Sequence, residues 1–323
     1  MAEGEPVGNK AVTNRSLPRL PLRFNKEGHL VKTKILRNTF LNLGMIFGLA
    51  IAARAQNLYV SLQGPLTNEG GSISEYTPTG VQQTFATAPF PRGIAFDNSG
   101  NFFVASTDSK VWDHGRVLKF PPNEHQTVVG NASQSFLEGL AMDTAGNVYA
   151  VALDDKSPDF AATIYKFAPD GTRTVFGTTP GQTFGLAFDG AGNLYAADAF
   201  DVTIYKFAPD GTRTVFVGPS AFTSTQLPAG LAFDSSGNLF VSTLGNRPND
   251  AILVFTPTGM ESTFATNLNN PHGIAFDAAG NLFVAETIRD GGGDILEFTT
   301  GGQRIVFASG LNRPEHLTFG PPR

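Results

Sequence analysis

Residues 273–286 read GIAFDAAGNLFVAE, and this stretch sets the fold because close variants of it occur five times in the chain. Each copy contains an apolar run, a D-x-x-G turn and a second apolar run, a pattern that predicts a β-hairpin. The aspartate is expected to accept backbone N–H bonds, and the glycine is expected to adopt a left-handed conformation. The copies begin at Gly93, Gly139, Gly185, Gly230 and Gly273, at intervals of 46, 46, 45 and 43 residues.

A second, weaker hairpin lies between successive copies. Its best versions are TIYKFAPDGTRTVF at 163–176 and the same run at 203–216. Four short strands in a unit of about 45 residues are typical of a propeller blade. We therefore predict an all-β fold, a β-propeller with four-stranded antiparallel blades.

The two ends of the repetitive region indicate how many blades there are. Residues 316–320 match only the first strand of a unit, and residues 57–61 match only the second strand. Together these pieces complete one blade, so we predict six blades and a ring closed by pairing of the N- and C-terminal strands. Such closure removes exposed sheet edges.

Charge is distributed unevenly along the chain. The formal net charge of −5 combines a net +6 in residues 1–55 with a net −11 in the remainder. A domain this acidic is a poor binder of phosphate backbones or anionic lipid, so we expect no nucleic-acid partner. The chain has no cysteine, which excludes disulfides and thiolate chemistry.

The basic N-terminal region has the features of a signal peptide. A basic segment, residues 31–39, precedes a mostly apolar run, residues 40–53, and Ala53 and Ala55 are small residues two positions apart. The apolar run is short for a membrane span, although an uncleaved anchor is the alternative. We predict cleavage after Ala55.

The polar residues 1–30 would make the basic segment far too long, so we expect translation to start at Val31 rather than Met1. Residues 1–55 are then an N-terminal extension and signal peptide, and residues 56–323 form the propeller. We expect a secreted or periplasmic bacterial monomer with no stable membrane span after cleavage.

Function is expected where the repeats differ. The connections that follow the second strand vary in length, whereas the D-x-x-G turns on the opposite face are nearly uniform. The residue before each conserved glycine belongs to the variable face and should ring the mouth of the central channel. We call this set the mouth column; in ring order it is Arg92, Glu138, Phe184, Ala229, His272 and Glu315.

A second column on the same face lies at the end of each second strand. We call it the strand-two column; its members are Ser106, Ala152, Asp198, Thr243, Glu286 and Leu62. From the two columns, Glu138, Glu315 and Asp198 are candidate ligands of a divalent cation, calcium or similar. Such an ion would polarise a carbonyl group or activate water.

His272 is the candidate general base, with Glu286 or Glu315 orienting it. The alternative is structural: Arg92 neutralises two flanking carboxylates, and His272 caps a strand. Arg92, Glu138 and Asp198 are also candidate ligand contacts. So are Trp112 and His114 of the long loop 107–115, which is a ligand lid, a weak metal site or a solvated loop with one anchoring aromatic residue.

The pattern P-x-G-I-A-F-D-x-x-G-N-L-[FY]-V-A-[DE] resembles the NHL-repeat propellers and the related gluconolactonase/regucalcin-like family over residues 56–323. That resemblance implies a propeller fold and, for the gluconolactonase-like enzymes, a metal held by Glu, Asn and Asp from separate blades. Glu138-Gly139-Leu140 is similar to the E-G-P motif of those enzymes.

Pro271-His272-Gly273 followed by Glu286 is similar to the histidine and glutamate of streptogramin lyases. Those lyases have seven blades and a tryptophan-rich second strand, whereas the only tryptophan here is Trp112. We therefore expect a binding or scaffold module for a small-molecule or protein/peptide ligand. The alternative is a metal-dependent hydrolase or lactonase of the gluconolactonase-like type, with a streptogramin-lyase-like enzyme as a less favoured one.

Overall fold

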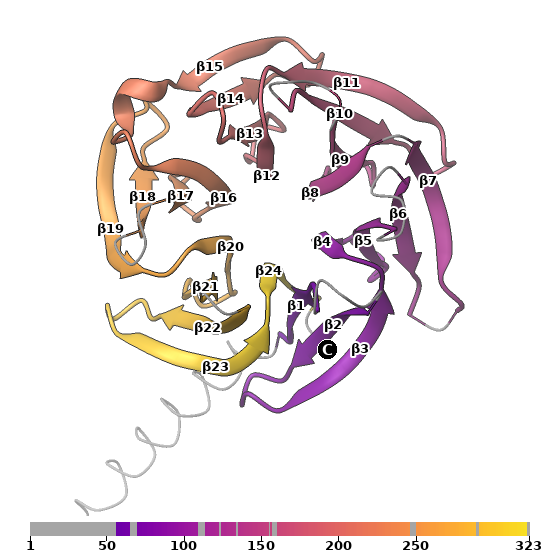
Figure 1. Cartoon of the computed structure of the whole chain (residues 1–323), viewed down its shortest axis with the longest axis horizontal. Helices are drawn as coiled ribbons and strands as arrows, with labels where there is room; N and C mark the ends of the chain where they lie inside the picture. The colour runs from indigo at the N-terminus through magenta and orange to yellow at the C-terminus, as the bar shows by residue number, and fades with distance from the viewer. Residues whose placement is uncertain are drawn as a thin grey trace, which may run out of the picture. The chain divides into compact units, whose positions relative to one another are not determined.

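A computed structural model of the chain describes residues 56–64, 70–108, 114–122, 124–133, 135–154, 156, 160–245, 250–288 and 291–321. These residues form six four-stranded antiparallel sheets arranged as blades around a central channel (Figure 1). The expected all-β, six-bladed propeller is confirmed. The expected signal peptide and cleavage site lie outside the described residues.

Five blades follow the chain in order, each from its innermost to its outermost strand. The first two comprise β4 (Pro91–Phe96), β5 (Phe102–Thr107), β6 (His114–Phe120) and β7 (Thr127–Ser133), then β8 (Phe136–Met142), β9 (Val148–Leu153), β10 (Ala162–Phe167) and β11 (Arg173–Thr179). The third comprises β12 (Thr183–Phe188), β13 (Leu194–Asp198), β14 (Thr203–Phe207) and β15 (Arg213–Val217).

A 3₁₀ turn, η1 (Pro219–Ala221), leads into the fourth blade. The fourth and fifth blades comprise β16 (Leu227–Phe233), β17 (Leu239–Leu244), β18 (Asp250–Phe255) and β19 (Glu261–Leu268), then β20 (Pro271–Phe276), β21 (Leu282–Thr287), β22 (Gly292–Phe298) and β23 (Arg304–Asn312). No helix among the described residues is long and apolar enough to cross a membrane.

The sixth blade is built from both ends of the repetitive region. Its innermost strand is the last of the chain, β24 (Pro314–Phe319), followed by β1 (Leu58–Leu62), β2 (Gly71–Tyr76) and β3 (Gln82–Ala88). The β1–β24 pair is antiparallel and aligns Leu58 with Phe319. The predicted closure by pairing of the terminal strands is therefore confirmed.

The D-x-x-G turns have the geometry that their sequence predicts. In the turn between β20 and β21, Asp277 Oδ1 accepts from the backbone N–H of Ala279 at 2.9 Å and of Asn281 at 2.8 Å, and Oδ2 accepts from Asn281 Nδ2 at 2.7 Å. Gly280 has a φ of +84°, a left-handed conformation that glycine adopts without a Cβ penalty. The turn therefore needs both residue types.

Hydrophobic contacts between neighbouring blades hold the ring together. Buried side chains form six clusters, one at each blade–blade interface. At the interface between the fifth and sixth blades, which ring closure forms, Tyr76 of β2 packs edge-on against Phe307 of β23, with ring centroids 5.8 Å apart. This interface has a buried hydrophobic cluster like the other five, so the ring is packed in the same way where it closes.

Candidate functional site: the channel mouth

Residues from several blades line a cavity of about 280 Å³ on the variable face. It lies at the mouth of the channel, where the innermost strands begin and the connections after the second strands pass over them. Its lining consists of Gln63, Arg92, Glu138, Gln182, Phe184, Asn270, His272, Thr287, Ile288, Gly291, Arg313 and Glu315. Five of the six mouth-column residues are in this set; Ala229 is the exception.

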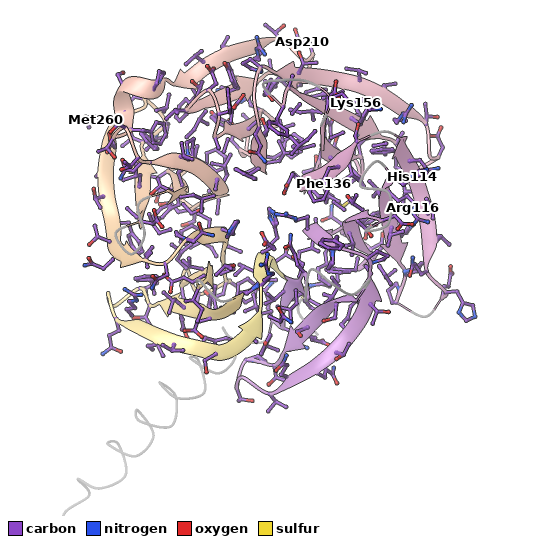
Figure 2. All side chains as sticks on the ribbon, viewed as in Figure 1. His114, Arg116, Phe136, Lys156, Asp210 and Met260 are labelled. Carbon is purple, nitrogen blue, oxygen red and sulfur yellow. The ribbon has the colours of Figure 1, made fainter. Side chains whose placement is uncertain are left out.

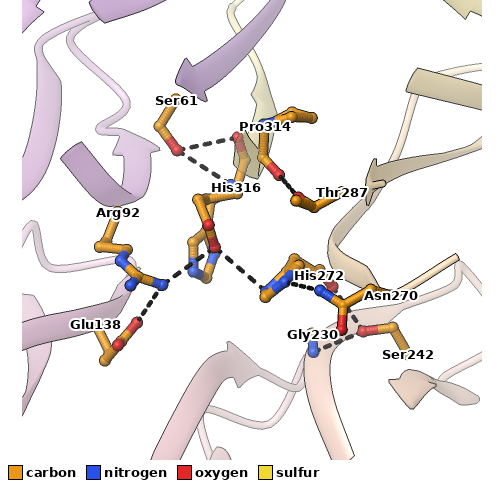
Figure 3. Close-up of polar contacts among 11 residues, drawn as sticks. Ser61, Arg92, Glu138, Gly230, Ser242, Asn270, His272, Thr287, Pro314 and His316 are labelled. Atoms are coloured by element: carbon orange, nitrogen blue, oxygen red, sulfur yellow. Dashed lines mark hydrogen bonds and ion pairs between the residues drawn. The ribbon is translucent and has the colours of Figure 1, made fainter. Parts of the chain in front are cut away.

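A charged network forms the floor of the cavity (Figure 3). Arg92 Nη1 lies 3.2 Å from Glu138 Oε2 and donates to Glu315 Oε2 at 3.1 Å. The two carboxylates are buried, and the Arg92 side chain is 17% exposed. The order of the mouth column predicts that two glutamates flank Arg92, and the structure brings these three residues together.

His272 continues the network on the other side of Glu315. Its Nδ1 lies 3.2 Å from Glu315 Oε2, and its Nε2 lies 2.6 Å from Asn270 Nδ2. An amide nitrogen only donates, so Nε2 acts as the acceptor and Nδ1–H points to the carboxylate. Asn270 is held by its own backbone N–H, which donates to Asp250 Oδ2 at 2.9 Å. The imidazole is therefore fixed at both nitrogens.

Two further side chains position the Arg92 guanidinium. The Phe136 ring lies beneath it, with 5.1 Å between the guanidinium carbon and the ring centroid. The Gln63 carboxamide faces it from β1's end, and in the orientation that satisfies both groups its oxygen accepts from Nη2 at 2.7 Å. Stacking and hydrogen bonding together restrict the guanidinium to one place.

Burial and neighbouring charges give Glu138 and Glu315 different pKa values. Burial raises the pKa of Glu138 to about 7, against the opposing effect of Arg92, while the charge on Glu315 raises it further. Burial also acts on Glu315, but Arg92 and His272 outweigh it and hold the pKa of that carboxyl below its ordinary value. Near neutral pH the pair thus contains one ionised carboxylate and one carboxyl that is partly protonated.

His316 stands out from the repeat because it occupies the position that is glycine in the five other blades. Its backbone is held by Ser61, whose Oγ accepts from the His316 N–H at 3.0 Å. The residue lines a second cavity of about 290 Å³ within the channel, among the backbones of the innermost strands. Burial lowers the pKa of His316 to about 4, so the imidazole is neutral near pH 7.

The mouth residues do not fit a divalent cation. The space between Glu138 and Glu315 is taken by the guanidinium of Arg92. Within the described residues no group of three or more His, Asp or Glu side chains is placed to hold a metal ion. Calcium takes six to eight oxygen ligands, far more than the two carboxylates here supply.

The structure does not bring the strand-two carboxylates into the cavity. Asp198 is fully buried in the third blade, where it accepts from the backbone N–H of Gly181 at 2.8 Å and of Asp201 at 3.0 Å. Asp198 therefore does not join Glu138 and Glu315 in the expected set of metal ligands. Its carboxylate instead fastens the connection into β12 and the turn after β13.

Glu286 has the same kind of environment in the fifth blade. Its Oε1 accepts from the backbone N–H of Asn269 at 2.8 Å, and its Oε2 lies 3.8 Å from Arg304 Nη2. Of the two carboxylates expected to orient His272, the structure places Glu315 against the imidazole and Glu286 against the connection into β20. Burial raises the pKa of Glu286.

The loop candidates are separated from the cavity. His114 begins β6, is exposed and is not part of the lining; Figure 2 shows it farther from the channel than Phe136. Trp112 lies outside the described residues. The neighbouring Arg116 and Asp108 form an exposed ion pair with 3.6 Å between Nη2 and Oδ2.

Sequence reasoning missed a third column, two residues before the mouth column. Its members are Phe90, Phe136, Gln182, Leu227, Asn270 and Arg313. Three of these, Gln182, Asn270 and Arg313, line the cavity, and a fourth, Phe136, supports Arg92. The polar members lie on the third, fifth and sixth blades and the apolar ones on the other three, and this break in symmetry is the signal that reveals them.

The fold and the mouth define the class: a six-bladed propeller with a polar site at one end of its channel. A family profile described as the SMP-30/Gluconolactonase/LRE-like region matches residues 68–265, more than half of the chain. The chain therefore belongs to this family, as its repeat pattern predicts. Among curated protein sequences none matches it.

Solved structures show the same fold at low identity. A gluconolactonase from Xanthomonas campestris is similar at 16% identity, covering 83% of this chain and 84% of its own, with a TM-score of 0.55. A calcium-binding protein, regucalcin, from Agrobacterium tumefaciens is similar at 14% identity, covering 71% and 83%, with a TM-score of 0.55.

A third neighbour is a catalytically inactive histidine-to-alanine variant of virginiamycin B lyase from Staphylococcus aureus, solved with quinupristin. It is 14% identical, covers 79% of this chain and 85% of its own, and has a TM-score of 0.54. Identities this low show a shared fold and leave the activity to be argued from the site.

Proposed function

We propose that the channel mouth binds a small, uncharged, polyhydroxylated molecule. The observation that carries this proposal is the cavity whose floor is the Glu138–Arg92–Glu315–His272 network and whose walls carry amides and a hydroxyl group. Clustering of buried titratable groups with perturbed pKa values in a concave site is typical of functional sites.

The size of the cavity favours a small ligand. Its volume of about 280 Å³ is at the lower limit of the roughly 300–1,000 Å³ found for sites that take drug-sized molecules. A compound of the size of a monosaccharide or a small lactone suits this space better than a peptide, which would have to lie across the rim.

The charges and polar groups favour an uncharged ligand rich in hydroxyls. Arg92 is balanced by Glu315, and Glu138 is partly protonated at neutral pH, so the floor has little net charge. Gln182, Asn270 and Thr287 offer donors and acceptors around it. Among the lining residues that the structure describes, Arg313 is the only charged one outside the floor network, so the lining matches alternating hydroxyl groups better than a multivalent anion.

Calorimetric titration with a panel of neutral sugars, polyols and sugar lactones tests the proposal. We expect saturable binding of at least one compound, weakened about tenfold or more by Asn270→Ala or Gln182→Ala, since each removes a polar contact to the ligand. Asp210→Ala, in an exposed turn of the opposite face, is the control. Binding that the two mouth variants leave unchanged would place the ligand elsewhere.

A second candidate is hydrolysis of a lactone at the same site, which family membership and the two differently protonated glutamates favour. In this scheme His272, released from Asn270, takes a proton from water, and the water oxygen bonds to the carbonyl carbon. Arg92 stabilises the resulting oxyanion. The ring C–O bond then breaks, and Glu138 gives its proton to the leaving alkoxide.

The catalytic candidate predicts a distinctive pH profile. Because Glu138 must be protonated, turnover should fall as the pH rises above about 7. Lactone hydrolysis followed by acid release, with EDTA present throughout, provides the assay. Turnover that is lost in His272→Ala and whose alkaline decline is altered in Glu138→Gln supports it; absence of turnover with intact ligand binding leaves the binding module alone.

A further inference from the structure

The guanidinium of Arg92 sits at the point where the charges of the mouth converge. Its Nη1 lies 3.2 Å from Glu138 Oε2 and 3.1 Å from Glu315 Oε2 (Figure 3). Glu315 Oε2 is also 3.2 Å from His272 Nδ1. Two carboxylates from two blades thus contact one organic cation, and His272 from a third blade contacts one of these carboxylates.

We propose that the Arg92 guanidinium takes the place of a divalent metal ion in this propeller: it occupies the position between Glu138 and Glu315 where such an ion would bind. The wild-type protein then neutralises its mouth carboxylates without a metal, and a ligand oxygen in the cavity meets guanidinium N–H groups. Removing the guanidinium exposes a latent metal site formed by Glu138, Glu315 and His272.

The surroundings of Arg92 support a permanent role for its charge. The side chain is stacked on Phe136 and faces the Gln63 carboxamide, so it is supported on several sides and is not a surface arginine that reached a carboxylate by chance. Its two partner carboxylates are 2% and 4% exposed. Buried carboxylates require a counter-charge; in the described contacts Arg92 is the cation that touches both carboxylates, whereas His272 touches Glu315 alone.

Loss of that counter-charge has a defined consequence. In Arg92→Ala the two carboxyl groups would lie on either side of the space the arginine vacates, and the repulsion between them when both are ionised would raise the pKa of Glu138 further. A divalent cation with carboxylate and imidazole ligands relieves this repulsion, provided the side chains close by a small rearrangement. The variant should thus become dependent on metal ions although the wild type is not.

Thermal unfolding with CaCl₂, MnCl₂ or EDTA tests this directly. For the wild type we expect the same Tm in all three conditions. Arg92→Ala should melt lower in EDTA and regain roughly 5 °C or more at saturating Mn²⁺, with a smaller response to Ca²⁺ because two carboxylates supply too few oxygen ligands for that ion. Arg92→Ala/Glu138→Gln should lose that response because one ligand is gone. Arg116→Ala removes an exposed arginine from a carboxylate and is the matched control.

Two results would overturn the proposal. One is an Arg92→Ala protein whose Tm is the same in saturating Mn²⁺ as in EDTA. The other is stoichiometric Mn²⁺ binding by the wild type, measured by electron paramagnetic resonance, that disappears in Glu138→Gln. The second measurement needs no arginine variant, so it decides the matter even if Arg92→Ala does not fold. Ligand binding by the wild type is a separate measurement, and either proposal can fail without the other.

Discussion

Arg92 Nη1 in β4 donates to Glu315 Oε2 in β24 at 3.1 Å, across a sequence separation of 223 residues. Glu315 reaches Arg92 because β24 pairs with β1, which places the last strand of the chain in the blade next to β4. The polar site at the mouth therefore depends on the same closure that gives the sixth blade its innermost strand. Stability of the ring and integrity of the site are linked through this contact.

Deleting residues 314–323 should abolish cooperative unfolding. The deletion removes β24, uncovers β1 and opens the interface between the fifth and sixth blades. Circular dichroism during heating should show a broad, early transition. Deleting only residues 321–323 is the control and should leave the Tm nearly unchanged. A sharp transition at the wild-type temperature after the longer deletion would show that closure is dispensable.

Glu138→Gln should stabilise the protein at alkaline pH. The folded-state pKa of about 7 lies above the ordinary value of 4.5, so the folded state binds more protons in this interval and stability falls as the pH rises through it. The glutamine variant avoids that loss and should melt a few degrees higher than wild type near pH 8. The difference should vanish near pH 4.5; an equal difference at both pH values would contradict the assignment.

His316→Asn should stabilise the protein at acidic pH relative to wild type, whereas Glu138→Gln does so at alkaline pH. The folded-state pKa of about 4 lies below the ordinary 6.5, so wild-type stability is complete above about pH 6.5 and is lost as the pH falls toward 4. The variant should therefore lose less stability between pH 6.5 and 4. Tm measurements across this range should also show steeper acid sensitivity in Glu138→Gln, because the compensating effect of that carboxyl is gone. Parallel curves for all three proteins would refute both assignments.

Gly230→Ala should be strongly destabilising. A Cβ at this position would lie 2.1 Å from the carbonyl oxygen of His272, so the two innermost strands would have to separate. We expect a loss of about 1–3 kcal/mol or more, measured by denaturant unfolding. Gly190→Ala, where a Cβ meets nothing within 4 Å, is the matched control and should change stability little. Similar values for both variants would mean that the blades tolerate the added methyl group.

Asp198→Ala should cost stability without affecting the mouth. The carboxylate is fully buried and accepts two backbone hydrogen bonds. Its removal therefore leaves the N–H groups of Gly181 and Asp201 without this hydrogen-bond acceptor. We expect a loss of about 2–3 kcal/mol in the free energy of unfolding. Ligand affinity measured by calorimetry should match wild type. A selective loss of affinity at unchanged stability would return Asp198 to the list of site residues.

The repeat pattern alone was enough to predict the architecture. Asp277 and Gly280 illustrate why: the turn they form depends on a local acceptor and a local left-handed residue, and both can be recognised in the sequence. Repetition of that unit implies the blades, and the unmatched terminal strands imply closure. The order of Glu138, Arg92, Glu315 and His272 around the mouth follows from the same alignment, because each blade places the same column at the same height.

The direction in which individual side chains point, and the groups they bond to, could be determined only from the tertiary structure. Asp198 and Glu286 belong to the strand-two column on the variable face, yet both carboxylates accept hydrogen bonds from backbone N–H groups of adjacent connections. Asn270 was not recognised, although it fixes the imidazole of His272. A column position specifies the strand and the face, whereas hydrogen bonding depends on which donor lies within about 3 Å once neighbouring blades have packed. The donors come close because segments far apart in the sequence pack together, and a local sequence pattern does not predict which segments these are.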